Sequence, residues 1–184
     1  VIIHTAARTH VLYTRTRDPY AVYRHVPANG PANLARAAVA NAVRRFVFLS
    51  SIKVNGESTP MDRPFTDRDT PAPEDAYGLT KLEAERLLLQ YATNRALEVR
   101  ILRPPLIYGP GVKGNLARLL HMVARGLPLP LRAVRNQRSM IALDNLTSAI
   151  MACADPAIAG SATHLVSDQD DLSTPELVEA VAAG

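Results

Sequence analysis

The sequence predicts an α/β fold in which helices cover a parallel sheet and a smaller lobe follows. Three short apolar runs, at residues 1–3, 46–49 and 99–102, are continuous rather than alternating. Continuous runs are typical of parallel strands that are buried on both faces. Helical patterns occupy residues 33–43 and 76–93 between these runs. Strands that alternate with helices are typical of layered α/β sheets with right-handed crossovers, and 184 residues suit one domain with a small addition.

The second half of the chain has a different pattern, which predicts the smaller lobe. Residues 115–125 predict a helix, and residues 139–143 predict a short strand. We expect Asp144 to cap the helix that follows this strand. Thr174 and Pro175 predict another helix start, because proline is tolerated at the first helical position. No linker separates the halves, so the lobe is expected to interleave with the sheet domain.

Composition narrows the partners that the protein can have. Net charge is +4, from 21 Lys and Arg against 17 Asp and Glu, but the arginines are scattered and aromatic residues make up only 5%. Nucleic-acid binding favours a concentrated basic surface with stacking aromatics, so we expect no nucleic-acid partner. No apolar run reaches the roughly 18 residues that span a bilayer, so no membrane partner is expected. A single cysteine, Cys153, fits a reducing compartment and a cytoplasmic location.

Tyr77 and Lys81 are candidate catalytic residues, because a phenol and an amine four residues apart share one helix face. Free tyrosine has a pKa near 10, and a close ammonium is expected to lower that pKa toward the working range. The spacing alone more often marks an ordinary exposed face. However, Ser50 and Ser51 directly follow residues 46–49, at the strand end where open α/β sheets bind their ligands.

Together these stretches resemble a known family, the extended short-chain dehydrogenases/reductases, which includes nucleotide-sugar epimerases, dehydratases and reductases. The resemblance covers nearly the whole chain and rests on these runs: Val1-Ile2-Ile3-His4-Thr5-Ala6-Ala7-Arg8, Phe46-Val47-Phe48-Leu49-Ser50-Ser51-Ile52-Lys53, Tyr77-Gly78-Leu79-Thr80-Lys81 and Leu102-Arg103-Pro104-Pro105-Leu106-Ile107-Tyr108-Gly109. It implies a Rossmann-like doubly wound parallel sheet. Residues 1–112 would form the C-terminal portion of the dinucleotide-binding domain. Residues 113–184 would form mainly a substrate-binding lobe, with segments that return to the first domain.

The resemblance also implies a role for individual residues. Ser51, Tyr77 and Lys81 would be catalytic. Contacts with the cofactor, NAD or NADP with NAD favoured, would come from Thr5, Ala6, Ala7, Arg8, Ser50, Tyr77, Lys81, Pro104 and Pro105. A nucleoside-diphosphate sugar would contact Ser51, Lys53, Asn115 and Arg138, with Arg138 gripping the diphosphate through charge-assisted hydrogen bonds. For Lys53, an ordinary exposed loop lysine is favoured over a role as a second base. The family further implies a homodimer that pairs through the two helices of residues 33–43 and 76–93, and no metal site is predicted.

The reaction that the resemblance favours is epimerisation at C4 of the sugar through a 4-keto intermediate. Sugar 4,6-dehydratases place an Asp-Glu pair after the catalytic hydroxyl, whereas Ser51 is followed here by Ile52 and Lys53, which disfavours dehydration. A 4-keto-sugar reductase remains an alternative. A dinucleotide-sensing protein without catalysis is a further one, although such proteins typically lose the tyrosine or the lysine.

Three departures from the family affect these predictions. The Gly-rich phosphate turn would lie before Val1, so we expect this stretch to be part of a longer enzyme and not to bind a dinucleotide alone. Pro27 and Pro31 stand where members have Asn and Thr. Because proline interrupts a helix, we expect a break between Val26 and Pro31, with a new helix start there. Leu106 also replaces an asparagine that several epimerases have.

Overall fold

A computed structural model describes residues 1–6, 29–94, 97–127, 129–131 and 133–183. The described chain forms two compact units. Unit 1 contains Val1–Pro104 and Ser148–Val166, and unit 2 contains Pro105–Thr147 and Ser167–Gly184. Among the described helices, none combines the length and the apolar character that crossing a membrane requires.

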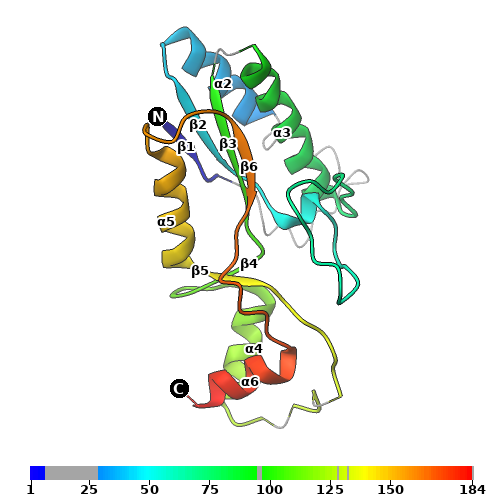
Figure 1. The fold of residues 1–184 in the computed structure, drawn as a ribbon. Helices are drawn as coiled ribbons and strands as arrows, with labels where there is room; N and C mark the ends of the chain where they lie inside the picture. The colour runs from blue at the N-terminus through cyan, green and yellow to red at the C-terminus, as the bar shows by residue number, and fades with distance from the viewer. Residues whose placement is uncertain (7–28, 95–96, 128, 132, 184) are drawn as a thin grey trace, which may run out of the picture. The chain divides into compact units, whose positions relative to one another are not determined.

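Unit 1 is built on a parallel sheet of four strands, in the order β1-β2-β3-β6 (Figure 1). The strands are β1 (Ile2–His4), β2 (Arg45–Leu49), β3 (Glu98–Arg103) and β6 (Ala162–Leu165). Every neighbouring pair runs parallel. The predicted α/β class and its parallel sheet are therefore confirmed, and the three predicted strands are β1, β2 and β3. The fourth strand, β6, was not predicted, because Ala-Thr-His-Leu is neither continuously apolar nor alternating.

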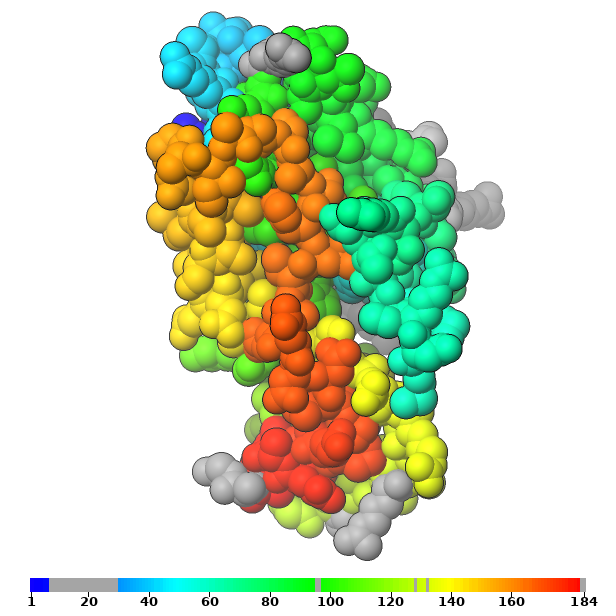
Figure 2. Space-filling view, in the orientation of Figure 1, coloured from blue at the N-terminus to red at the C-terminus, as the bar shows by residue number. Residues whose placement is uncertain are grey.

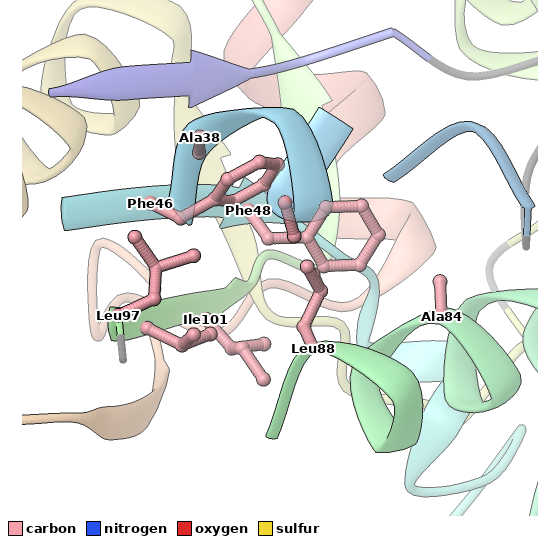
Figure 3. Packing of buried hydrophobic residues seen from close by; sticks show 9 residues of the cluster. Ala38, Phe46, Phe48, Ala84, Leu88, Leu97 and Ile101 are labelled. Carbon is pink, nitrogen blue, oxygen red and sulfur yellow. The ribbon is translucent and has the colours of Figure 1, made fainter. Parts of the chain in front are cut away.

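One face of the sheet carries two helices, α2 (Asn29–Ala40) and α3 (Ala76–Thr93), which also contact each other. Their small and aliphatic side chains form one buried cluster with Phe46 and Phe48, in which Figure 3 labels Ala38, Ala84 and Leu88. Because each buried side chain removes apolar surface from water, this cluster supplies the main hydrophobic stabilisation of unit 1.

The opposite face of the sheet packs against the second half of α5 (Leu143–Ala154). Val47 lies between Phe46 and Phe48 and points to this face, where it packs with Leu102, Cys153 and Ile150. Residues 148–166 form part of the surface of unit 1 in Figure 2, in yellow to orange. Burial on both faces explains why residues 46–49 are apolar without alternation.

The predicted helix start near Pro31 is confirmed, since α2 begins at Asn29 with Pro31 buried in its first turn. Proline is tolerated there because the first helical N–H groups lack intrahelical partners in any case. Pro27 lies outside the described residues. The helix ends earlier than the predicted residue 43, in a turn at which Ala42 adopts the left-handed conformation, with φ 55°.

Unit 2 contains a parallel strand pair, β4 (Leu106–Tyr108) with β5 (Met140–Ala142), and two helices in contact, α4 (Gly114–Ala124) and α6 (Thr174–Ala183). These agree with the predicted helices and strand. The expected cap at Asp144 is wrong, because α5 already begins at Leu143 and Asp144 lies inside its first turn.

The cap of α6 is Ser173, one residue before the predicted start at Thr174. Its hydroxyl accepts a hydrogen bond from the backbone N–H of Glu176 at 3.3 Å. In return, the Glu176 carboxylate accepts one from the backbone N–H of Ser173 at 2.7 Å. This reciprocal pattern satisfies two N–H groups that a helix start otherwise leaves without partners.

Candidate active site

The predicted site residues of unit 1 gather at the carboxyl edge of its sheet. Strands β1, β2 and β3 are neighbours and run parallel, so the residues that follow them share one edge. Thr5 and Ala6 follow β1 and are exposed. The segments after β2 and β3 are joined by a hydrogen bond from the Ile52 N–H to the Pro104 carbonyl, at 2.9 Å. Ala7 and Arg8 lie outside the described residues.

Ser51 opens a short 3-10 turn, η2 (Ile52–Val54), directly after β2. Its hydroxyl accepts a hydrogen bond from the Lys53 N–H at 3.3 Å and so caps this turn. Ser51 is partly exposed, whereas its neighbour Ser50 is buried. The serine that the resemblance assigns to catalysis is thus the accessible member of the pair.

Tyr77 stands in the first turn of α3, which Asp75 caps by accepting a hydrogen bond from the Gly78 N–H at 2.6 Å. The turn η2 packs closely against this helix start. A Cβ atom on Gly78 would lie 2.7 Å from the Lys53 carbonyl oxygen, which is closer than real Cβ contacts come. Glycine at this position therefore allows the segment that carries Ser51 to contact the turn that carries Tyr77.

Lys81 lies one turn after Tyr77 and is buried, with 2% of its surface exposed. Its ammonium donates a hydrogen bond to the Leu49 carbonyl at 2.7 Å. It also lies 4.7 Å from the ring centroid of Phe48 and 5.8 Å from that of Tyr77. Burial lowers the pKa of Lys81 to about 8, and the Glu85 carboxylate opposes this effect. A lysine in this state exchanges its proton near neutral pH.

The expected lowering of the Tyr77 pKa by Lys81 is wrong for this structure. Burial and then the Asp75 carboxylate raise the pKa of Tyr77 to about 12, and the Lys53 ammonium opposes them only in part. The loss of water around the phenol outweighs nearby positive charge, because burial disfavours the charged form. A further positive charge is needed before Tyr77 becomes a base near neutral pH.

Lys53 forms ion pairs with Glu57 and Asp75, both at 2.7 Å. Burial works against its charge, but the hydrogen bonds that Lys53 donates to these two carboxylates outweigh burial and raise the pKa of Lys53. A lysine with a raised pKa stays protonated and is a poor base. Lys53 therefore serves here to join the Ser51 turn to the cap of α3, and its predicted contact with substrate stays a prediction.

A buried polar network beneath the site was not predicted. The Ser50 hydroxyl donates to the Glu85 carboxylate at 2.5 Å, and Arg103 donates to both oxygens of the same carboxylate, at 3.0 and 2.5 Å. Arg103 also donates to the Asn55 side-chain oxygen at 3.0 Å. The signal that could have found Glu85 is its spacing, since residues 77, 81 and 85 recur every four positions on one helix face.

Asn115 and Arg138 belong to unit 2, and both side chains are exposed. Asn115 lies in the first turn of α4. The backbone of Arg138 exchanges two hydrogen bonds with that of Leu172, at 2.9 and 3.2 Å, which fixes the point where its side chain leaves the chain. Their predicted contacts with a sugar diphosphate stay predictions.

Comparison with known proteins identifies the family. The model of the NAD dependent epimerase/dehydratase family matches residues 1–163. The chain belongs to this family. It is 45% identical over 183 residues to a UDP-glucose 4-epimerase from Vibrio cholerae. The aligned residues cover 99% of this chain and 56% of that protein. The chain thus spans about half the length of this relative.

Two solved structures with bound ligands show the same fold. MoeE5 in complex with UDP-glucose and NAD is 30% identical with a TM-score of 0.73, over 85% of this chain and 53% of that one. RMD from Pseudomonas aeruginosa complexed with NADPH is 26% identical with a TM-score of 0.80, over 98% and 62%. Both cofactor types therefore occur among structural neighbours of this chain.

The carboxyl edge of unit 1 suits the reactive end of a dinucleotide. Thr5 and Ala6 are exposed just after β1. His4 carries a buried Nδ1 atom without a hydrogen-bond partner, one of two such atoms in the part of the chain that the structure describes. The ammonium of Lys81 uses one donor on Leu49 and has others to offer. These features fit the cofactor contacts that the family implies, and the contacts themselves stay a prediction. In the described ranges, no group of three or more His, Cys, Asp or Glu residues could hold a metal ion.

Proposed function

We propose that the whole protein is an NAD(P)-dependent 4-epimerase of nucleoside-diphosphate sugars that works through a 4-keto intermediate. The observation that carries the proposal is the joint placement of Ser51, Tyr77 and Lys81 on two packed segments at one sheet edge. The 45% identity to a UDP-glucose 4-epimerase supports it and makes UDP-glucose the first substrate to test.

In the proposed reaction, Tyr77 as phenolate takes the proton of the sugar C4 hydroxyl while Ser51 donates a hydrogen bond to the C4 oxygen. The bound oxidised dinucleotide supplies a hydride acceptor and a positive charge beside the phenol. The Lys81 ammonium by itself leaves the pKa of Tyr77 at about 12, and the added charge of the dinucleotide would offset the burial of the phenol. Tyr77 would return the same proton to the C4 oxygen once C4 has regained, on its other face, the hydride that it gave to the bound dinucleotide, so that the inverted alcohol forms.

The substrate and cofactor contacts belong to the same proposal. Thr5, Ala6, Pro104 and Pro105 are proposed to contact the cofactor, and Ala7 and Arg8 are proposed to continue this set. NAD is favoured over NADP, since the neighbour that holds UDP-glucose also holds NAD. The exposed Arg138 is proposed to grip the diphosphate, with Asn115 as a further contact.

A second candidate is a 4-keto nucleotide-sugar reductase on the same site. The observation in its favour is the likeness to a structure that contains NADPH. The two functions differ in net redox, because an epimerase regenerates its cofactor in each cycle and a reductase consumes it. The third alternative, a dinucleotide sensor, is disfavoured because both Tyr77 and Lys81 are present.

The test uses the whole protein with NAD and UDP-glucose, with the products separated by NMR. We expect the C4 epimer to accumulate to an equilibrium mixture while the absorbance at 340 nm stays constant. A stoichiometric fall in that absorbance with NADPH and a 4-keto sugar, without epimer formation from UDP-glucose, would favour the reductase instead.

We further propose a cytoplasmic homodimer that pairs through α2 and α3, with no nucleic-acid or membrane partner. Three side chains support the dimer: Leu34, Val39 and Leu89 lie on these two helices with more than a third of their surface exposed. Apolar side chains on neighbouring helices suit a helix-to-helix interface.

A further inference from the structure

The ion pair between Glu85 and Arg103 lies deep in unit 1. Only 1% of the Glu85 side chain and 6% of the Arg103 side chain are exposed. Removing two charges from water costs several kcal/mol per ion, and apolar residues of similar volume often stabilise a core at least as well. Stability alone therefore gives little reason for this pair, which points to a role in holding a geometry.

The pair connects three separate segments of unit 1. Glu85 lies on α3, Arg103 ends β3, and Ser50, which donates to Glu85, directly follows β2. Arg103 reaches a fourth point through Asn55, which closes the turn η2. The Asn55 amide then donates to the Thr66 carbonyl at 3.1 Å. Each of these buried side chains has a hydrogen-bond partner, and a network of hydrogen-bonded side chains favours one rigid arrangement.

Three members of the network are near neighbours of proposed site residues. Ser50 precedes Ser51, and Arg103 precedes Pro104. Glu85 lies one turn after Lys81 and two turns after Tyr77, on the same helix face. A shift of the network would therefore move the phenol, the ammonium and the serine hydroxyl relative to one another.

We propose that Glu85 and Arg103 are positioning residues, whose buried pair fixes α3 against the ends of β2 and β3 and thereby places Tyr77 and Lys81 relative to Ser51. This inference rests on the proposed function of Tyr77 and Lys81. It adds two residues that touch neither substrate nor cofactor and act through the groups beside them.

The charges around Lys81 give this proposal a distinctive readout. On its own helix Lys81 faces Tyr77 and Glu85, while His4 faces it from β1, and β2 contributes the Phe48 ring and the Leu49 carbonyl. The Arg103 guanidinium lies behind Glu85 on β3. Among the residues that the structure describes, Glu85 is the one carboxylate that raises the Lys81 pKa against burial. Neutralising Glu85 would also leave the Arg103 charge unbalanced, so both effects lower the pKa of Lys81.

The main variant is Glu85→Gln in the whole protein, because glutamine keeps the shape and removes the charge. We expect kcat with UDP-glucose to fall about 10- to 100-fold, since small misplacements of reacting groups cost rates of that order, while KM changes little. In a plot of kcat against pH, the decrease at alkaline pH should move to lower pH, because the pKa of Lys81 is lower in this variant. Unchanged kcat and an unchanged alkaline decrease in a folded variant would overturn the proposal.

Two lysine substitutions provide a matched comparison, Arg103→Lys and Arg45→Lys. Arg45 is as buried as Arg103 (3% against 5% exposed) and pairs with Glu98 at the opposite end of the same strands. In each variant the carboxylate loses a contact in which two arginine nitrogens donate hydrogen bonds to it, so both changes should lower Tm. Only Arg103→Lys is expected to lower kcat. An equal loss of kcat in Arg45→Lys would mean that general destabilisation explains the effect and would contradict positioning.

A readout without turnover separates this inference from the proposed function. The protein is labelled with ¹³C at lysine Cε, the Lys81 signal is assigned with Lys81→Arg, and its pKa is followed by NMR. We expect the pKa of Lys81 to be lower in Glu85→Gln than in the wild type and unchanged in Arg45→Lys. If the wild type fails to epimerise any nucleoside-diphosphate sugar, the proposed function fails while this titration still tests the network. If Glu85→Gln does not fold, the comparison of kcat between Arg103→Lys and Arg45→Lys carries the test, and an unchanged kcat in Arg103→Lys would overturn the proposal.

Discussion

At the scale of single residues, the site depends on how burial changes the protonation of Lys81 and Tyr77. Burial disfavours charge in both, so it lowers the pKa of the lysine to about 8 and raises that of the phenol to about 12. The sequence predicted that these two residues share a helix face, which the structure confirms. It could not predict the direction of the tyrosine shift, because burial depends on segments far away in the chain.

The Lys81 pKa predicts a specific pH dependence of stability. Between pH 8 and 10.5 the unfolded chain holds a proton on Lys81 that the folded chain has released. The contribution of Lys81 to the free energy of unfolding therefore increases as pH rises. Lys81→Met removes this contribution. We expect the stability of the variant relative to wild type to decrease by about 1–3 kcal/mol from pH 7.5 to 10, measured by urea unfolding. A difference that does not change with pH would contradict a lowered Lys81 pKa.

At the scale of secondary-structure elements, the contact between η2 and α3 sets the site. The sequence predicted α3 with its observed bounds, because its apolar pattern and its start before Tyr77 are local features. The close approach of the Lys53 carbonyl to Gly78 was not predictable, since it joins residues 25 positions apart through η2 and its connecting loop.

The contact predicts opposite effects of two glycine substitutions. Gly78→Ala should destabilise the protein by about 1–3 kcal/mol and lower kcat, because its Cβ would meet backbone 2.7 Å away and push η2 from α3. Gly30→Ala on α2 meets nothing within 4 Å and should stabilise by up to about 1 kcal/mol through helix propensity. Thermal unfolding measures both. Equal gains in Tm would mean that the Gly78 contact is absent in solution.

At the scale of the whole molecule, the sequence predicted the layered sheet and the place of the site, because both follow from local patterns and from the family. It could not predict the network of Ser50, Glu85, Arg103 and Asn55. The pairing of Glu85 with Arg103 depends on where α3 lies against β3, and no spacing in the sequence determines that. The strand β6 was not predicted for a related reason. Its pairing with β3, and not its composition, makes it a strand.

The proposed dimer is tested at this scale by charged substitutions on two exposed apolar residues. Leu89→Glu places a charge on α3, within the proposed interface, and should shift the protein toward monomer in sedimentation experiments because a buried charge is costly. Met151→Glu on α5 is the control, since Met151 is also exposed and lies on the helix that covers the other face of the sheet. A dimer that persists in Leu89→Glu would rule out pairing through this part of α3.

The central claim is that Tyr77 transfers the proton at C4 of the sugar, and one comparison tests it most directly. Tyr77→Phe and Tyr91→Phe each remove one phenol oxygen from the same helix, and Tyr91 packs at the edge of the core. With UDP-glucose and NAD, we predict that Tyr77→Phe loses about 10²- to 10⁴-fold in kcat while Tyr91→Phe keeps the rate of the wild type. Epimerisation by Tyr77→Phe at the wild-type rate would contradict the account.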